Sequence, residues 1–477
     1  MKNSTKYDLR DFSSLEKDLL LFERNYNGFN YWQSIRFFVC ESLFGNRSDN
    51  RKKEIEERKR SAISYIKEIL VAVIISIKEL FRFIFLKKVD LLFLRQDLGS
   101  DLFYDSWNLP DDISCINYRV AQYSKEHKPD DHFLEWPRIK TRITQRVTAK
   151  FGLYKKDKKE KVFLKKLENK LIDLYGQSMT ADEMERWIID SKIEEKHYYR
   201  AFKKIFDKTE CKAIALECYY SNCFYPAYRI AKKKKIAIVE FQHGVINNHE
   251  EYWFEDDRGV NNYVPDYLLT FGAVHNEWIK LVKSQKAIAI GFPFQEKRLK
   301  ELKDVIPDEK EIIIYPDSNP NFEEVIDEFV NEIVQYGYRV TMKMHPLQMS
   351  NVSLYYPRLS LNKNINIVTS QKEGIYYWLK KAKHHIMAST TVGLEAVALD
   401  HTNVCIATNV PHDQVECLLE WKIARGFNSA EELKALIMDP IDMNNDLAKN
   451  ARERLWKENA SDNMTAFFEK LKNNNWA

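Results

Sequence analysis

Three short segments of the chain carry side chains that could bind an anion or move a proton. They are Gln242-His243-Gly244, Lys343-Met344-His345-Pro346, and residues 389–396, which read Ser-Thr-Thr-Val-Gly-Leu-Glu-Ala. Imidazole transfers protons near neutral pH, and ammonium, imidazole and hydroxyl groups all donate hydrogen bonds to phosphate oxygens. The three segments together predict one site that holds a phosphorylated ligand beside a proton-transfer group.

In the second segment, Pro346 disfavours the helical conformation for His345, so we expect this histidine to end a strand in extended backbone. Lys343 lies two residues earlier on the same side of the strand and could add positive charge. A His-Pro pair is common by chance, and it indicates a binding site only in combination with the other two segments. We therefore predict that Lys343, His345 and Pro346 contact a phosphate group.

In the third segment, Ser389, Thr390 and Thr391 offer hydroxyls and backbone amides at the start of a predicted helix, where an anion is favoured. Ordinary N-capping is the alternative interpretation. Capping does not account for Glu395, because a capping box that starts at Thr391 would place its acid at position 394, which is leucine. A glutamate one turn into the helix could instead accept hydrogen bonds from two ribose hydroxyls.

In the first segment, His243 has a side chain suited to general-base catalysis, and Gly244 allows a tight turn or the close approach of a ligand. The alternative is a histidine whose hydrogen bonds are satisfied within a turn. Together with the two other segments, His243 is the leading candidate for the general base.

Each segment follows a strand-like run, at residues 236–239, 338–342 and 384–387, and open α/β sheets bind ligands at the carboxyl ends of their strands. Other strand-like runs occur at 90–95, 212–217, 267–272, 287–291, 312–315, 365–368 and 403–407. Helical periodicity occurs at 163–175, 181–206, 322–336, 374–381 and 394–399. The alternation predicts an α/β fold with two doubly wound, Rossmann-like sheets that face a cleft, the second sheet beginning near Pro265.

A chain of 477 residues is longer than one core usually supports. We expect an N-terminal helical extension over residues 1–88, Rossmann-like domains over 89–264 and 265–440, and a closing helix in 441–477, at about 449–471. The extension includes a predicted helix at 61–86, which is too short in its apolar part to span a bilayer. Its charged residues fall on one arc of roughly 120°. The wide apolar remainder must face either protein or an anionic membrane surface.

Composition limits the class of protein further. The net charge is only +4. A basic block at 138–170 could meet phosphates, an anionic membrane leaflet or nucleic acid, but we interpret it as a solvated helix pair with a charged turn, and no motif for nucleic-acid recognition accompanies it. The seven cysteines form no CxxC pair and the N-terminus has no apolar signal region, so reduced thiols in the cytoplasm are expected. No metal-ligand cluster or DxD pair is present, which favours a reaction without a metal and does not exclude Mg²⁺.

The ordered motifs QHG, KMHP and STTVGLEA, with Gly291-Phe292-Pro293 after a strand, resemble the GT-B-fold transferases of bacterial surface polysaccharides. The similarity is to capsule and lipopolysaccharide Kdo transferases, HP-motif sialyltransferases and teichoic-acid CDP-glycerol glycerophosphotransferases. It covers roughly residues 90–471. The resemblance implies an acceptor-binding first domain and a nucleotide-donor-binding second domain.

The resemblance also implies roles for single residues. His345 would bind the donor phosphate, Ser389 and Thr390 would supply hydroxyl partners, and Glu395 would contact the ribose. The glycerophosphotransferase relatives imply His243 as base. The sialyltransferase relatives use an aspartate of an acidic-acidic-glycine motif, of which residues 256–259 are only an approximate copy. Rival bases in the first domain are the acids Asp101, Asp105 and Glu217.

The expected activity is inverting transfer of a sugar from a nucleotide-activated donor, with a CMP-sugar favoured, to a lipid-linked or oligosaccharide acceptor of capsule, O-antigen or lipooligosaccharide. The protein would act in the cytoplasm, with peripheral contact at the inner face of the membrane. Three alternatives remain open at this point: a CDP-polyol phosphotransferase, a UDP-sugar epimerase, and a non-catalytic polysaccharide-assembly protein.

Overall fold

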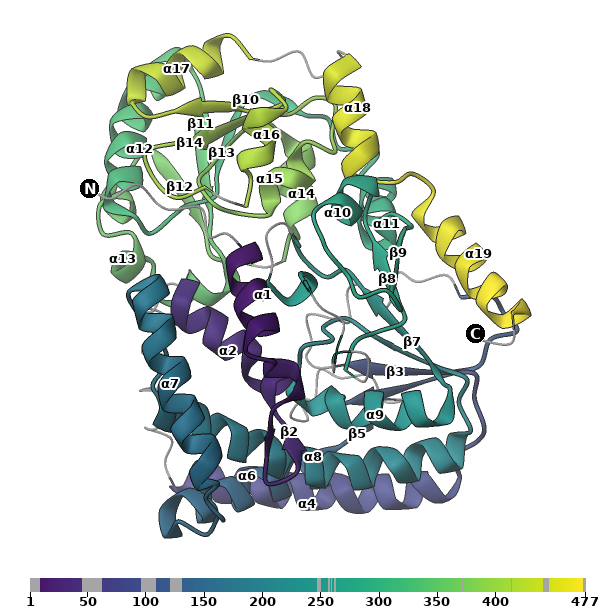
Figure 1. The fold of residues 1–477 in the computed structure, drawn as a ribbon. Helices are drawn as coiled ribbons and strands as arrows, with labels where there is room; N and C mark the ends of the chain where they lie inside the picture. The colour runs from purple at the N-terminus through teal and green to yellow at the C-terminus, as the bar shows by residue number, and fades with distance from the viewer. Residues whose placement is uncertain are drawn as a thin grey trace. The chain divides into compact units, whose positions relative to one another are not determined.

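The chain forms two compact units. The computed structural model describes residues 9–44, 62–95, 109–120, 131–246, 250–255, 258, 260, 263–370, 372–412, 414–440 and 446–474. The first unit comprises residues 1–270, 277–288 and 464–477, and the second comprises 271–276 and 289–463. Each unit is an α/β structure with its own sheet (Figure 1).

The first unit contains a seven-stranded sheet in the order β5-β4-β3-β6-β7-β8-β9. The strands are β3 (Leu91–Arg95), β4 (Cys115–Arg119), β5 (His132–Phe133), β6 (Ala213–Leu216), β7 (Ala237–Phe241), β8 (Tyr267–Thr270) and β9 (Lys286–Ala289). Every pair from β5 to β8 is parallel. Strands β3, β6 and β7 are buried along their whole length, which explains their nearly continuous apolar sequences.

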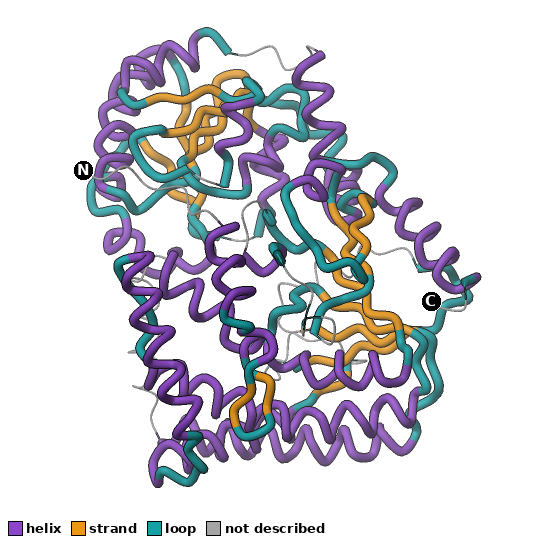
Figure 2. The backbone as a smooth tube through the Cα atoms, in the orientation of Figure 1, coloured by secondary structure: helices purple, strands orange, loops and turns teal. Residues whose placement is uncertain are grey.

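Helices flank this sheet (Figure 2). They include α6 (Glu135–Phe151), α7 (Lys158–Tyr175), α8 (Ala181–Thr209) and α9 (Tyr225–Lys234). A capping box begins α8, because the Thr180 hydroxyl accepts a hydrogen bond from the Glu183 amide and the Glu183 carboxylate accepts one from the Thr180 amide. Helices α6 and α7 end at glycines with positive φ, Gly152 and Gly176. The predicted helix pair in the basic block is confirmed.

The N-terminal segment packs into the core of the first unit. It contains α1 (Leu9–Asp18), a two-stranded hairpin of β1 (Asn25–Tyr26) and β2 (Phe29–Asn30), α2 (Trp32–Phe44) and α4 (Ala62–Ile84). Buried Trp32 belongs to the same apolar cluster as the sheet residues Leu92 and Ile214. The buried Arg36 Nε lies 2.7 Å from Glu16 Oε1, so this ion pair joins α1 to α2.

The second unit contains a six-stranded, wholly parallel sheet in the order β12-β11-β10-β13-β14-β15. The strands are β10 (Asp308–Ile314), β11 (Arg339–Lys343), β12 (Ile365–Val368), β13 (Ala382–Met387), β14 (Asn403–Ala407) and β15 (Arg425–Phe427). The helices are α10 (Ala273–Glu277), α11 (Pro293–Glu301), α12 (Pro320–Ile333), α13 (Val352–Tyr355), α14 (Ile375–Lys381), α15 (Val392–Ala396), α16 (Glu416–Glu420), α17 (Ala430–Met438) and α18 (Asp446–Leu455).

Both sheets reverse their strand order in the way that nucleotide-binding sheets do. In the sheet of the second unit, the first three strands of the chain lie in the reverse order, β12-β11-β10, and the later strands continue on the other side of β10. The reversal therefore lies between β10 and β13. In the first unit it lies between β3 and β6. Ligands of doubly wound sheets bind outside the carboxyl ends of the strands at this reversal point. The predicted fold class, two doubly wound α/β sheets, is confirmed.

Two details of the sequence-based prediction are wrong. The strands near residues 267 and 287 were expected to begin the second sheet, but β8 pairs with β7 and extends the first. The expected closing helix is two helices, α18 and α19 (Ala460–Asn473), because Asn459 takes a left-handed conformation with φ of 57° between them. Residues 464–477 group with the first unit, and the predicted domain boundaries stay a prediction.

Candidate functional site

The carboxyl ends of three adjacent strands carry the predicted residues of the second unit. Ile314 at the end of β10 pairs with Met342 of β11 on one side and with Ile386 of β13 on the other, so the three strands end at a similar level. His345 follows β11 and Ser389 follows β13. The structure therefore brings the second and third sequence segments to the same edge of one sheet, at its reversal point.

The hydroxyl-bearing loop after β13 is not explained by N-capping at Thr391. Thr391 is the N-cap residue of α15, and its side chain makes no capping hydrogen bond. The Val392 amide donates a long bond of 3.4 Å to Thr390 Oγ1. Ser389 is partly exposed and its hydroxyl makes no hydrogen bond to the described residues. Because α15 has only five residues, side-chain hydroxyls matter more than a helix dipole here.

Glu395 lies on α15 and is partly buried. Burial raises the pKa of its carboxyl to about 7, and the neighbouring Tyr376 hydroxyl opposes this shift. The Glu395 charge in turn contributes to the raised pKa of Tyr315, which is due mainly to burial. Tyr315 directly follows β10, so Glu395 lies near the carboxyl end of that strand as well. Its carboxyl group titrates close to neutral pH, where a hydrogen-bonding role would depend on its charge.

Lys343 and His345 differ in their surroundings. The Lys343 ammonium donates a 2.8 Å hydrogen bond to the backbone carbonyl of Ser370, which follows β12. Burial lowers the pKa of Lys343, and the nearby Glu373 opposes that shift. His345 is exposed, and its carbonyl accepts a hydrogen bond from the Gln348 amide within a short 3-10 helix, Pro346–Asn351. His345 thus lies where a ligand could reach it, whereas the ammonium of Lys343 is already held at the end of β12.

In the first unit, His243 follows β7 and lies beside an aromatic side chain. Its Nε2 is 3.4 Å from the Tyr220 hydroxyl, and the two ring centroids are 6.1 Å apart. Gln242 Nε2 donates a 2.9 Å hydrogen bond to the Gly244 carbonyl, which closes the turn. Gly244 does not have a positive φ, and a Cβ there would meet no atom within 4 Å. The backbone of this turn therefore does not itself require glycine, and the close approach of a ligand at Gly244 stays a prediction.

Of the rival bases, the structure describes only Glu217. It follows β6, and only 9% of its surface is exposed. Strands β6 and β7 are adjacent, with Leu216 paired to Glu240, so Glu217 and His243 lie at neighbouring strand ends. Asp101 and Asp105 lie outside the described residues, as does most of the approximate acidic motif at 256–259. His243 and Glu217 belong to the first unit and the phosphate-binding candidates to the second, so their sharing of one site stays a prediction.

Sequence reasoning missed a buried carboxyl group three residues before His243. Glu240 Oε1 accepts hydrogen bonds from the Tyr219 amide and the Tyr252 hydroxyl, both at 3.0 Å. Burial raises the pKa of Glu240 to about 8, and the charge of Glu251 adds to the shift. The available signal was a glutamate inside the otherwise apolar strand Ala237–Phe241. This network fixes the loop after β6 against β7, and so positions Tyr220 next to His243.

A pocket of about 750 Å³ opens at the carboxyl ends of β4 and β6 in the first unit. Aromatic rings form one wall, where the rings of Phe38 and Trp187 stack with their centroids 3.8 Å apart and an interplanar angle of 14°. Arg138, Arg142, Glu194 and Tyr220 add polar groups. Burial raises the pKa of Glu194 to about 7. Flat aromatic surface combined with charged hydrogen-bonding groups suits a saccharide, and Tyr220 also contacts His243.

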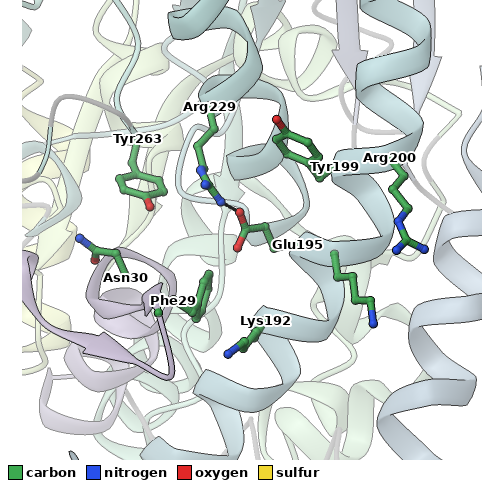
Figure 3. Close-up of a pocket in the computed structure, with 10 residues that line it drawn as sticks. Phe29, Asn30, Lys192, Glu195, Tyr199, Arg200, Arg229 and Tyr263 are labelled. Atoms are coloured by element: carbon green, nitrogen blue, oxygen red, sulfur yellow. Dashed lines mark ion pairs between the residues drawn. The ribbon is translucent and has the colours of Figure 1, made fainter.

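A second pocket of the first unit, of about 480 Å³, is drawn in Figure 3. It lies between α8, α9 and the β1–β2 hairpin, and none of the sequence-predicted site residues lines it. Arg229 forms an ion pair with Glu195 across its floor (Figure 3). Lys192, Lys196 and Arg200 leave the pocket with an excess of positive charge. Its lining is chemically suited to a carboxylate or phosphate group.

Comparison with known proteins finds no matching family model and no matching curated protein. Solved structures do match. The UDP-GlcNAc 2-epimerase of Methanocaldococcus jannaschii is 14% identical, with 80% of this chain and 99% of that chain covered and a TM-score of 0.44. Phytolacca americana UGT2, bound to UDP-2-fluoro-glucose and pterostilbene, is 10% identical, with 81% of this chain and 100% of that chain covered and a TM-score of 0.46. Acinetobacter baumannii MurG is 12% identical, with 80% of this chain and 99% of that chain covered and a TM-score of 0.40.

Among the described residues, no three His, Cys, Asp or Glu side chains are grouped so that they could hold a metal ion. Within the same residues, none of the helices combines the length and the hydropathy that crossing a membrane requires. The matching structures include a glycosyltransferase and UDP-GlcNAc 2-epimerases. The strand order of the two sheets, rather than these distant matches, carries the assignment of fold.

Proposed function

We propose that the protein is a glycosyltransferase that moves a sugar from a nucleotide-activated donor to a growing surface saccharide. One observation carries the proposal: His345, the Ser389-Thr390-Thr391 loop and Glu395 gather at the carboxyl ends of β10, β11 and β13, where the strand order reverses. Exposed imidazole and hydroxyl donors suit a phosphate, and a carboxyl one turn into the following helix suits a ribose. The combination favours a nucleotide over a simple anion.

In the proposed reaction, His243 removes the proton from an acceptor hydroxyl. That oxygen attacks the anomeric carbon of the donor sugar, and the bond from this carbon to the nucleotide phosphate breaks with inversion. His345, Ser389 and Thr390 hydrogen-bond the phosphate oxygens, on which negative charge grows as the nucleotide leaves. Pro346 holds His345 in extended backbone, and Lys343 braces the neighbouring loop through its bond to the Ser370 carbonyl.

We favour a CMP-sugar as donor and a capsule, O-antigen or lipooligosaccharide chain as acceptor, on the resemblance of the three motifs to transferases of that kind. The 750 Å³ pocket in the first unit supports an acceptor, because its stacked aromatic wall and charged groups suit a saccharide. Glu217 is the alternative base within the described residues. The proposed location is the cytoplasmic face of the membrane, where lipid-linked acceptors are assembled.

A CDP-polyol phosphotransferase would use the same phosphate contacts but would transfer a phosphate-linked polyol. A UDP-sugar epimerase would also hold the diphosphate of its substrate through these residues. An epimerase needs no acceptor and would change the free nucleotide sugar. A non-catalytic assembly protein would bind no nucleotide. The chemistry of the products therefore separates all four functions.

The first test measures the thermal shift of the protein with CMP, CDP, UDP and GDP, for the wild type and for Ser389→Ala and His345→Ala. Lys310→Ala is the matched control, because it removes an exposed cation from the opposite, amino-terminal end of β10. We expect one nucleotide to raise the melting temperature of the wild type and the control, and to have a much smaller effect on the two site variants. Equal shifts in all four proteins would remove the proposed nucleotide site.

The second test incubates the protein with the matching nucleotide sugar, with and without an oligosaccharide acceptor, and identifies the products by mass spectrometry and NMR. Free nucleotide together with an extended acceptor supports the transferase. An epimerised nucleotide sugar in the absence of acceptor would contradict it in favour of the epimerase.

A further inference from the structure

Helix α4 packs on the first unit with Glu79 and Arg82 turned inward. Glu79 Oε2 lies 2.9 Å from His132 Nδ1 of β5. Arg82 donates a 2.6 Å hydrogen bond to the Asp131 carbonyl and a 2.8 Å bond to Glu79 Oε1. Ala72 and Ile75 are also buried on this side. Glu79 and Arg82 therefore join this helix to its own protein, whereas an ordinary surface helix turns its charged residues to the solvent.

The other half of α4 is apolar and exposed. Phe81 is 62% exposed, Leu80 63% and Phe85, just after the helix, 79%. The exposed apolar residues of this half, which we call the apolar face, are Leu70, Val71, Val73, Ile74, Ile77, Leu80, Phe81, Ile84 and Phe85. At 100° per residue they occupy about half of the helix circumference.

The apolar face is larger than the isolated apolar patches that soluble proteins usually expose. If a fully exposed Leu, Ile or Phe side chain presents roughly 175 Å², the nine residues expose on the order of 900 Å², against roughly 300–600 Å² for the largest patch on a typical monomer. Such a surface marks an interface. In Figure 1, α4 runs along the edge of the first unit, beneath α8.

The charges around the apolar face identify its partner. Lys67 and Lys78 are exposed at the margin of the face, and α6, which packs beside α4, exposes Lys140, Arg146 and Lys150. The exposed charged side chains that the structure describes on these two helices are all basic. Helix α6 also exposes large apolar side chains, among them the aromatic residues Trp136 at 55% and Phe151 at 63%. Apolar surface bordered by lysine and arginine, with aromatic residues, is the composition that binds an anionic lipid interface.

A second copy of the chain fits this surface less well. A twofold contact places the same patch of both copies together, so the basic margins of the two copies would face each other and repel. Crossing the bilayer is also excluded for α4, because its inward half forms polar bonds to the protein. These observations favour a helix that lies in the plane of the membrane surface.

We propose that the apolar face of α4, with the basic residues of α4 and α6, binds the surface of an anionic phospholipid bilayer. The helix lies in the interface with Phe81, Ile77 and Phe85 among the acyl chains and the lysines at the headgroups. The binding rests on exposure and charge alone, so it does not depend on the proposed transferase activity. A lipid-linked acceptor would then be delivered by the same surface that binds the protein.

The test is flotation of the full chain with vesicles of phosphatidylcholine alone and of phosphatidylcholine mixed with phosphatidylglycerol at about 30%. We expect binding to the anionic vesicles that weakens with added salt, and at least a tenfold loss of binding for the double variant Ile77→Asp/Phe81→Asp. Leu361→Asp is the matched control, because Leu361 is 80% exposed on the second unit, and it should bind like the wild type.

The melting temperature of each variant and the mass of each protein in solution complete the experiment. Ile77→Asp/Phe81→Asp replaces side chains that are exposed, so its melting temperature should match that of the wild type. If the wild type ignores anionic vesicles, or if the double variant binds them equally well, the proposal is wrong. A wild-type dimer that becomes a monomer in the double variant, without vesicle binding, would show that a second copy covers the face instead.

Discussion

The pH dependence of nucleotide binding gives the sharpest test of Glu395. If its carboxylate accepts hydrogen bonds from ribose hydroxyls, only the ionised form binds fully. Burial raises the pKa of Glu395 to about 7. With that pKa, about nine tenths of the protein carries the ionised group at pH 8 and about one tenth at pH 6. Nucleotide affinity should therefore fall about tenfold, or about 1.4 kcal/mol, between pH 8 and pH 6.

The variant Glu395→Gln keeps the shape of the side chain and removes its titration. Its affinity should be lower than that of the wild type at pH 8 and close to it at pH 6. Phosphate groups of the nucleotide also titrate in this range, with a second pKa of about 6. That contribution is common to both proteins, so the ratio of the two dissociation constants at each pH isolates the effect of Glu395.

The assay is isothermal titration calorimetry at pH 6, 7 and 8, with the nucleotide that gives the largest thermal shift. The corresponding 2′-deoxynucleotide is a second control, because it lacks a ribose hydroxyl. Glu309→Gln, at the amino-terminal end of β10, tests for a general effect of removing a carboxylate. A ratio that stays constant from pH 6 to pH 8 would refute the ribose contact, even if the nucleotide binds tightly.

Four further predictions concern Glu240, His345, Gly272 and the metal dependence of the reaction. Glu240→Gln should gain stability relative to the wild type as pH rises from 5 to 9, because a buried carboxyl with a pKa of about 8 opposes ionisation in the folded state. The free energy that ionisation of Glu240 costs the folded wild type is absent below the unfolded pKa near 4.5 and reaches up to about 5 kcal/mol above pH 8. Denaturant titration of both proteins at pH 5 and pH 9 measures this difference. His345→Ala should keep its circular dichroism spectrum and melting temperature, and lose at least a hundredfold in kcat with the nucleotide sugar. Gly272→Ala should lower the melting temperature by several degrees, since its Cβ would lie 2.3 Å from the Arg454 carbonyl oxygen. Activity should survive EDTA if the proposed mechanism is right, and loss restored by Mg²⁺ would contradict it.

Strands such as β3 and β14 could be predicted because they are buried on both faces. Runs such as Leu91–Arg95 and Asn403–Ala407 are apolar over most of their length, and this pattern is typical of a parallel sheet covered by helices. The assignment of strands to sheets could not be predicted in the same way. Strand β8 looks the same in either sheet, and only its pairing with β7 decides. Short strands such as β5, with two residues, carry too few side chains to show a pattern.

The candidate site was partly predictable for a related reason. A polar cluster directly after an apolar run stands out, and this located Ser389, His345 and His243. Aromatic residues such as Tyr315, directly after β10, and Tyr376, on α14, do not stand out, because tyrosine is as common in a core as in a site. Tyr315 and Tyr376, whose positions affect Glu395, were therefore missed, and the pKa shift that makes Glu395 testable depends on burial that only the fold supplies.

The orientation of helix α4 could not be predicted from the sequence pattern. The helical wheel correctly predicts a charged arc of roughly 120° and a wide apolar remainder, but the two halves are equally able to face protein. The charged arc is divided in the structure: Glu79 and Arg82 turn inward to His132 and the Asp131 carbonyl, while Lys78 stays exposed. An inward charge is stable only where a partner exists, and those partners lie about 50 residues further along the chain. The orientation of α4, and with it the inferred membrane face, therefore follows from tertiary contacts that no local pattern contains.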